Sequence, residues 1–131
     1  VIPGIATSDE TFQVTWNLAE KVGKTPAKAS DYPGCIANRI LLPMINEAVY
    51  CLYHGVGNRE DIDTVMKLGM NHPMGPLQLI DMIGLDIHRA KMQTLRRELD
   101  DPRYAHPKLL DEMIDAGNLG RKTGKGFYTY E

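Results

Sequence analysis

The side chains best suited to acid–base or metal chemistry are few and scattered. The two cysteines, Cys35 and Cys51, are too few for a disulfide framework or for a four-ligand zinc site, and they favour a reducing intracellular compartment. The four histidines are His54, His72, His88 and His106. No two of them have the i, i+4 spacing of a helical zinc site. The residues alone therefore predict neither a complete catalytic set nor a metal site.

A glycine-rich basic segment, GRKTGKG at residues 120–126, could bring a cation close to a phosphate or a ribose. It is not a phosphate loop of the Walker A type. Its glycines are one residue too close together, and Gly126 stands where Ser or Thr would coordinate magnesium. A contact with a cofactor and a plain solvated turn both remain open from composition alone.

Asn38 stands among apolar neighbours, namely Ile36, Ala37, Ile40 and Leu41. This pattern predicts an amide in or near a buried face of a helix, where an amide without hydrogen bonds is costly. A partner elsewhere in the fold, a helix end or a ligand in a cleft would each satisfy it.

Composition and charge narrow the class of protein. The chain has 131 residues, of which 43% are hydrophobic and 24% charged, as in ordinary globular domains. Its formal net charge of −2 argues against capture of nucleic acid or of an anionic membrane. No apolar run approaches ~18 residues, and no basic-then-apolar leader is present. We expect no membrane span and a cytoplasmic location, or the mitochondrial matrix in a eukaryote.

The first thirty residues (1–30) predict one helix followed by one strand. Ser8 is a suitable N-cap ahead of two acidic residues in the first turn, and Gly23 ends the helix. Residues 24–30 read as a short strand. A helix and a lone strand cannot make a sheet, so we expect the tail of an α/β domain. The opening Val1 with no initiator methionine leads us to expect a piece of a longer protein.

Helical periodicity dominates residues 31–131, so the fold class is predicted to be mainly α. The expected helices are a long one over residues 36–52 bent by Pro43, one from Asn58 to Gly69, a short one from Pro76 to Ile83, one over residues 86–99 and a last one around residues 109–114. The long helix is apolar around more than half its girth, and so small a domain has too few elements to cover it. Burial against another subunit or domain is therefore expected.

Several motifs, in one order along the chain, resemble the C-terminal domain of the L-3-hydroxyacyl-CoA dehydrogenases. They are DYPGCIANRIL at 31–41, NEA at 46–48, EDIDT at 60–64, MKLG at 66–69, HPMGP at 72–76, the stretch 81–86, and GRKTGKGFY at 120–128. Upstream, ATSDET at 6–11 and GKTP at 23–26 resemble the last helix and strand of the family's nucleotide-binding domain. The resemblance thus covers nearly the whole chain.

The resemblance implies a multihelical C-terminal dimerisation domain of the 6-phosphogluconate dehydrogenase C-terminal-like type, preceded by a helix–strand remnant of a Rossmann domain. It implies reversible oxidation of a 3-hydroxyacyl-CoA to a 3-oxoacyl-CoA with NAD, in fatty acid or butanoate metabolism, by a homodimer. The family's dinucleotide loop, catalytic histidine and partnering glutamate would precede Val1. NAD would then be bound mainly outside this chain, which is expected to be inactive alone.

Four residues take roles from the resemblance. Asn38 matches the family's active-site asparagine, which helps to position the 3-oxygen of the substrate. Lys122 matches a lysine that reaches the NAD. Leu42 and Pro73 match positions that line the acyl side of the cleft. Cys35 departs from the family, which usually has a bulky aromatic there, and we expect a short acyl chain such as acetoacetyl.

Two other functions remain open. The same architecture could serve a sugar-acid dehydrogenase of the gulonate type, because that choice depends on residues outside this chain. A non-catalytic helical dimerisation module would also explain the apolar long helix, but it explains the ordered motifs poorly. Nucleic-acid binding is a weak fourth reading.

Overall fold

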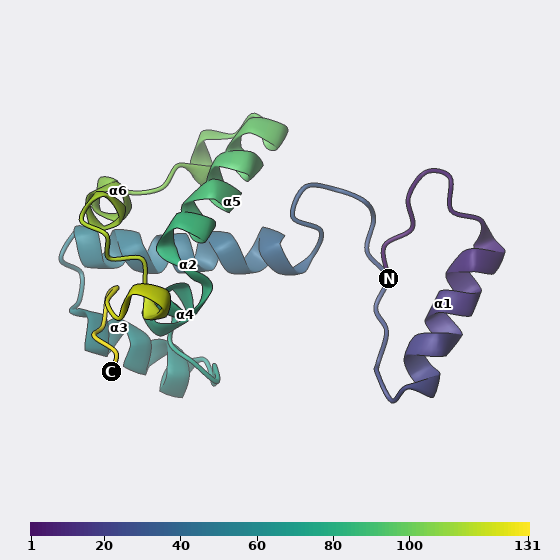
Figure 1. The fold of residues 1–131 in the computed structure, drawn as a ribbon, viewed down its shortest axis with the longest axis horizontal. Helices are drawn as coiled ribbons and strands as arrows, with labels where there is room; N and C mark the ends of the chain where they lie inside the picture. Colours follow the sequence, from purple (N-terminus) through teal and green to yellow (C-terminus); the bar gives the residue numbers. More distant parts are fainter. The chain divides into compact units, whose positions relative to one another are not determined.

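The computed structural model describes all 131 residues, and its regular elements are helical (Figure 1). They are α1 (Asp9–Lys21), α2 (Ala37–Tyr53), α3 (Arg59–Thr64), the π-helical η1 (Val65–Gly69), α4 (Pro76–Ile83), α5 (Leu85–Leu99), the 3-10 turn η2 (Pro102–Tyr104), α6 (Lys108–Asp115) and the 3-10 turn η3 (Arg121–Thr123). Two isolated β-bridges occur near the C-terminus, but no strand forms. The predicted mainly α fold is confirmed. None of these helices is both long and apolar enough to cross a membrane.

The chain divides into two compact units, residues 1–39 and residues 40–131. In the first unit, the Oγ of Ser8 accepts a hydrogen bond from the Thr11 N–H at 3.2 Å and caps α1 as predicted. Gly23 follows the helix with a φ of +77°, which suits glycine and ends the helix. No residue of α1 is buried.

The strand predicted over residues 24–30 is wrong. The Lys24 N–H donates to the Ala19 carbonyl at the end of α1, and the other two backbone hydrogen bonds of this segment are both with Val1. The Val1 amine donates to the Ala27 carbonyl at 2.7 Å, and the Ala29 N–H donates to the Val1 carbonyl at 3.1 Å. A strand needs a continuous ladder of such bonds with a neighbouring strand. One terminal residue cannot provide that ladder.

The second unit is built around α2. Two clusters of buried side chains join it to α4, α5, α6, η2 and Phe127. The larger contains Ile45, Ala48 and Val49 of α2 with Leu77, Ile80, Leu85, Leu110 and Phe127, and the smaller contains Leu42 with Met92, Leu95 and Tyr104. Figure 1 shows α5 crossing α2, with α6 beside its C-terminal part. The α2 helix continues through Pro43, because a proline costs one backbone hydrogen bond that burial of the flanking residues offsets.

The N-terminal residues of α3 and α4 agree with the prediction, but the hydrogen-bond acceptor at the start of α4 belongs to a residue distant in the sequence. Asn58 accepts a hydrogen bond from the Asp61 N–H at 2.8 Å and caps α3. Pro76 is the first residue of α4, as predicted. The free N–H groups of the next two residues donate to the buried carboxylate of Asp63, at 2.8 and 3.0 Å. A carboxylate at a helix N-terminus is favoured by the helix dipole. A Cβ at Gly75 would overlap this carboxylate.

His88 is a buried histidine without a hydrogen-bond partner. It lies on α5 with no exposed surface, and neither ring nitrogen has a partner. Burial lowers the pKa of His88 to about 4, with smaller contributions from His106 and Lys91. The ring is therefore neutral in the folded chain at neutral pH and would have to be charged inside the core at low pH.

We predict that His88 makes the folded chain less stable as the pH falls from 6.5 to 4. The unfolded chain binds the proton near pH 6.5 and the folded chain only near pH 4. The neutral ring therefore imposes no penalty above pH 6.5, and the penalty below pH 4 reaches about 3 kcal/mol. Urea denaturation across this range measures the effect. His88→Leu should flatten the slope, and His54→Gln, at an exposed histidine, should leave it unchanged. Equal slopes in His88→Leu and the unmutated chain would contradict the prediction.

Candidate functional site

The C-terminal loop is held by one buried carboxylate, that of Asp81 on α4. Its Oδ1 accepts a hydrogen bond from the Phe127 N–H at 2.9 Å. Its Oδ2 accepts one from the Tyr128 N–H and one from the Tyr130 hydroxyl, each at 2.9 Å. Three donors thus satisfy a charge that is only 1% exposed, as a buried carboxylate requires. Burial, followed by the Asp81 carboxylate, raises the pKa of Tyr130 to about 12.

Two glycines of the basic segment are required by this anchor. A Cβ at Gly126 would overlap the Asp81 carboxylate, and a Cβ at Gly120 would overlap the backbone of Asp81. Gly120 also has a φ of +101°, which other residues rarely adopt. The glycine spacing of this segment is therefore explained by close approach to α4 rather than by a phosphate.

Tyr128 ties the same loop to α3. Its single hydroxyl hydrogen is shared between the Asp63 carboxylate, at 2.9 Å, and the Arg59 carbonyl, at 3.1 Å. The Arg59 guanidinium lies 5.2 Å from the centre of the Tyr128 ring and donates to the Phe127 carbonyl at 2.6 Å. Burial and the hydrogen bond to Asp63 raise the pKa of Tyr128, so its hydroxyl remains a donor.

Lys122 lies on η3, within the anchored loop. Its ammonium donates to both carboxylate oxygens of Asp86, at 2.6 and 2.7 Å. Both side chains keep access to solvent, 44% for Lys122 and 36% for Asp86. The hydrogen bond from Lys122 is the largest contribution that lowers the pKa of Asp86. The Lys122 ammonium is therefore paired with a carboxylate of the first turn of α5.

Asn38 lies on the first turn of α2 and is exposed. The expectation that its amide sits in or near a buried face is wrong for this chain. The reason is that its apolar neighbours are themselves uncovered, with Ile36 exposed by 51% and Ile40 by 67%. Periodicity marks a face that needs covering, but it does not say whether residues of the same chain cover it. The amide makes no hydrogen bond within the chain and is free to bind a ligand.

Leu42 and Pro73 differ in their access to solvent. Leu42 is 1% exposed and packs against Met92, Leu95 and Tyr104 in the smaller core cluster. Pro73 is exposed and precedes α4. The predicted role of both residues in lining the acyl side of a cleft stays a prediction.

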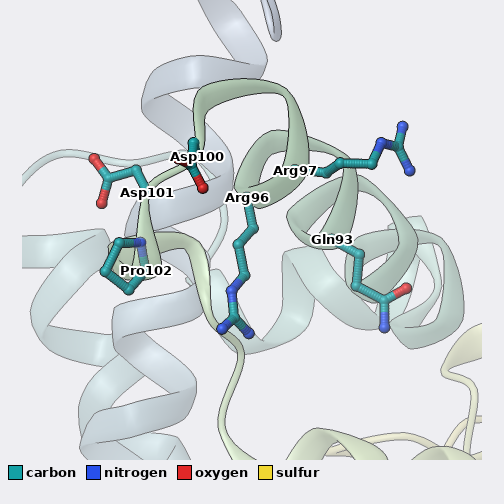
Figure 2. Close-up of a pocket in the computed structure, with 6 residues that line it drawn as sticks. All are labelled: Gln93, Arg96, Arg97, Asp100, Asp101 and Pro102. Carbon is teal, nitrogen blue, oxygen red and sulfur yellow. The ribbon is translucent and has the colours of Figure 1, made fainter.

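Two cavities of the second unit are lined by residues that were not predicted as site residues. One, of about 470 Å³, lies at the C-terminal end of α5 (Figure 2) and is lined by Gln93, Arg96, Arg97, Asp100, Asp101 and Pro102. Its two arginines point in different directions, and Arg97 pairs with Glu98 at 2.8 Å. The charges do not converge on a common point. No group of three or more His, Cys, Asp or Glu side chains could hold a metal ion.

The second cavity is an apolar groove of about 400 Å³ between α2 and the α3–η1 segment. It is lined by Met44, Glu47, Ala48, Cys51, Val56, Gly57, Asp61, Ile62, Val65, Met66 and Pro76. Val56 and Val65 are also largely exposed, by 76% and 59%. Neither cavity is lined by Asn38, Leu42, Pro73 or Lys122.

Comparison with known proteins decides the family. The model of the 3-hydroxyacyl-CoA dehydrogenase C-terminal domain matches residues 34–130. The chain belongs to this family. It is 56% identical over 131 residues to the "Probable 3-hydroxybutyryl-CoA dehydrogenase" of Bacillus subtilis, covering all of this chain and 46% of that protein. It is 55% identical over 130 residues to the 3-hydroxybutyryl-CoA dehydrogenase of Bradyrhizobium diazoefficiens, covering 99% of this chain and 44% of that protein.

The fold agrees with that assignment. The crystal structure of the (S)-3-hydroxybutyryl-CoA dehydrogenase of Ralstonia eutropha matches with a TM-score of 0.95 and 50% identity, over 99% of this chain and 46% of that one. The chain thus spans a little under half the length of the relatives that it matches. The predicted family and fold class are therefore confirmed.

Of the predicted residues, Lys122 fits a contact with NAD. Its ammonium has three N–H donors, and the two Asp86 oxygens engage at most two of them, which leaves at least one for a ribose or phosphate oxygen. The described residues contain no glycine-rich dinucleotide loop between a strand and a helix.

Sequence reasoning missed the structural roles of Asp63, Asp81 and Asp86. Asp81 carried a usable signal, since it is the only charged residue of the mostly apolar α4 and such a residue needs hydrogen-bond donors. What the pattern could not show is that the donors come from residues 127–130.

We predict that Asp81→Asn destabilises the chain by about 2–3 kcal/mol. An asparagine keeps one acceptor oxygen. Its NH₂ group would face one or more of the groups that now donate hydrogen bonds to the carboxylate. Urea denaturation measures the change, with Asp115→Asn, at an exposed aspartate of α6, as the matched control. A value for Asp81→Asn equal to that of the control would show that the loop does not depend on this carboxylate.

Proposed function

We propose that this chain is the substrate-cleft and dimerisation part of an NAD-dependent L-3-hydroxyacyl-CoA dehydrogenase with a short-chain acyl-CoA substrate. The match of the whole chain to 3-hydroxybutyryl-CoA dehydrogenases carries the proposal. NAD would accept the hydride from C3 of the substrate. Residues outside this chain would supply the acid–base histidine, its glutamate and most of the cofactor site. A cytoplasmic location, or the mitochondrial matrix in a eukaryote, goes with this function.

Asn38 is proposed to position the 3-oxygen of the substrate. Its exposed amide has both a donor and an acceptor and no partner within the chain. An amide donor directed at the 3-oxygen would stabilise the negative charge that develops on this atom in the transition state. The first turn of α2 fixes the backbone that carries it.

The remaining contacts are proposed to be peripheral. Lys122 is proposed to donate to the NAD, from the loop that Asp81 anchors. Pro73 and Leu42 are proposed on the acyl side of the cleft. Only Pro73 is exposed, so only its replacement would test direct contact with the acyl chain.

The helical domain is proposed to form a homodimer. The apolar groove between α2 and the α3–η1 segment supports this proposal, because exposed valines at its edge leave a surface that water solvates poorly. Ile40 of α2 and Leu68 of η1 are also exposed, by 67% and 80%. A second copy is the partner that the family resemblance implies.

We predict that Asn38→Ala lowers kcat at least about tenfold, equivalent to ~1.4 kcal/mol of transition-state stabilisation. The assay follows NADH absorbance after acetoacetyl-CoA is added to the full-length protein that carries this chain, with the 131-residue chain as a control. We expect the full-length protein to catalyse rapid oxidation of NADH and the isolated chain to catalyse none.

The control variant for that assay is Asn17→Ala, at an exposed asparagine of α1, which should keep full activity. Full activity in Asn38→Ala would remove Asn38 from the site. A folded full-length protein that binds NADH but does not oxidise it with acetoacetyl-CoA would contradict the proposed substrate and favour a sugar acid.

We predict that Val56→Asp weakens dimerisation at least about a hundredfold, because a buried, unpaired carboxylate costs several kcal/mol. Analytical ultracentrifugation of the full-length protein across a dilution series measures the association. Ile5→Asp, at another exposed apolar residue, is the control and should not change it. A Val56→Asp variant that dimerises normally would place the interface elsewhere.

A further inference from the structure

We propose that Asp86 is a positioning residue for Lys122, holding its ammonium in place so that the remaining N–H donates to the cofactor. The proposal deepens the proposed function, since it rests on the contact between Lys122 and NAD. Asp86 itself would not touch the cofactor. It would act by reducing the conformational freedom of a long, flexible side chain.

The geometry of the pair is that of a two-point contact. Both Asp86 oxygens lie within 2.7 Å of the Lys122 Nζ, although the two residues are 36 positions apart in the sequence. Asp86 lies in the first turn of α5, so its backbone is fixed by the helix. Lys122 lies on the 3-10 turn η3, which packs against α4. Both ends of the pair are thus carried by ordered backbone.

The backbone around the pair leaves room for it. Gly84 has a φ of +103°, and a Cβ there would lie 3.0 Å from the Asp86 Oδ1 and 3.3 Å from the Lys122 Nζ. Both distances are tighter than ordinary contacts. A side chain at position 84 would therefore press on both members of the pair. The glycine at the α4–α5 junction therefore leaves room for the pair.

The pair also determines how Lys122 can bind. A lysine ammonium is a mobile point charge, and ordering its side chain costs rotamer entropy. Because Asp86 already orders it, that cost is not incurred on binding. Asp86 also balances its charge. Lys122 would then recognise the cofactor by a directed hydrogen bond more than by net charge. A ribose hydroxyl oxygen can accept such a bond.

Two other roles for Asp86 make different predictions. If Asp86 only fastens the loop to α5, its loss lowers stability and leaves NADH binding unchanged. If Asp86 competes with the cofactor for the ammonium, its loss tightens NADH binding. Only a positioning role predicts weaker binding that depends on the presence of Lys122.

The test is a double-mutant cycle in the full-length protein. The variants are Asp86→Ala, Lys122→Ala and the pair together, with Asp86→Asn as a conservative variant that keeps one acceptor oxygen. NADH affinity is measured by fluorescence titration, KM for NAD and kcat by the acetoacetyl-CoA assay, and stability by thermal unfolding. Asp115→Ala and Lys125→Ala, at exposed residues without ion pairs, are the matched controls.

We expect Asp86→Ala to weaken NADH binding about fivefold and to raise KM for NAD with little change in kcat. Asp86→Asn should recover part of that loss. The double variant should bind NADH no more weakly than Lys122→Ala, since Asp86 acts through Lys122. These results together support the proposal. Should Asp86→Ala unfold, Asp86→Asn and its cycle with Lys122→Ala decide the same question.

The failures are distinguishable. Unchanged or tighter NADH binding in both Asp86 variants, with weaker binding in Lys122→Ala, overturns the positioning role alone. Unchanged binding in Lys122→Ala overturns the proposed cofactor contact, and the positioning role with it. Additive losses in the double variant also overturn the proposal, because they show that Asp86 acts independently of Lys122.

Discussion

The arrangement of the second unit depends on the buried carboxylate of Asp81. A negative charge with 1% exposure is tolerated only if donors replace the water that it loses, and three donors of residues 127–130 do so. These donors belong to the last residues of the chain, while Asp81 belongs to α4. Satisfying one charge therefore fixes the path of the whole C-terminal loop.

A second buried carboxylate extends the same network. Asp63 accepts from the first free N–H groups of α4 and from the hydroxyl of Tyr128, whose own N–H donates to Asp81. Tyr128 thus joins the two carboxylates and holds α3, α4 and the loop at one place. Lys122 lies on this loop, and Asp86 lies just beyond α4 on the next helix. The pairing of Lys122 with Asp86 is therefore a consequence of where Asp81 and Asp63 hold the loop.

Local features of the fold could be predicted from the sequence, and distant ones could not. The caps Ser8 and Asn58 and the first residue of α4, Pro76, were predicted correctly because each acts on backbone within a few residues. The strand over residues 24–30 was wrong because a strand is defined by its neighbour. The donors for Asp81 lie more than forty residues away, and no local pattern indicates them. The π-helical η1 was also missed, since helical periodicity does not separate it from an α-helix.

The use of their hydrogen-bonding groups distinguishes the structural polar residues of this chain from those proposed to bind ligands. Asp63 and Asp81 are buried, and all their carboxylate oxygens accept hydrogen bonds from the chain itself, so they have nothing left to offer a ligand. Asn38 is exposed with no partner, and Lys122 keeps at least one N–H donor that Asp86 does not engage. Sequence reasoning placed Asn38 in a buried face because its neighbours are apolar, yet identified it as a site residue by resemblance. Unused hydrogen-bonding capacity, rather than burial, is the physical property on which the proposed roles of Asn38 and Lys122 rest.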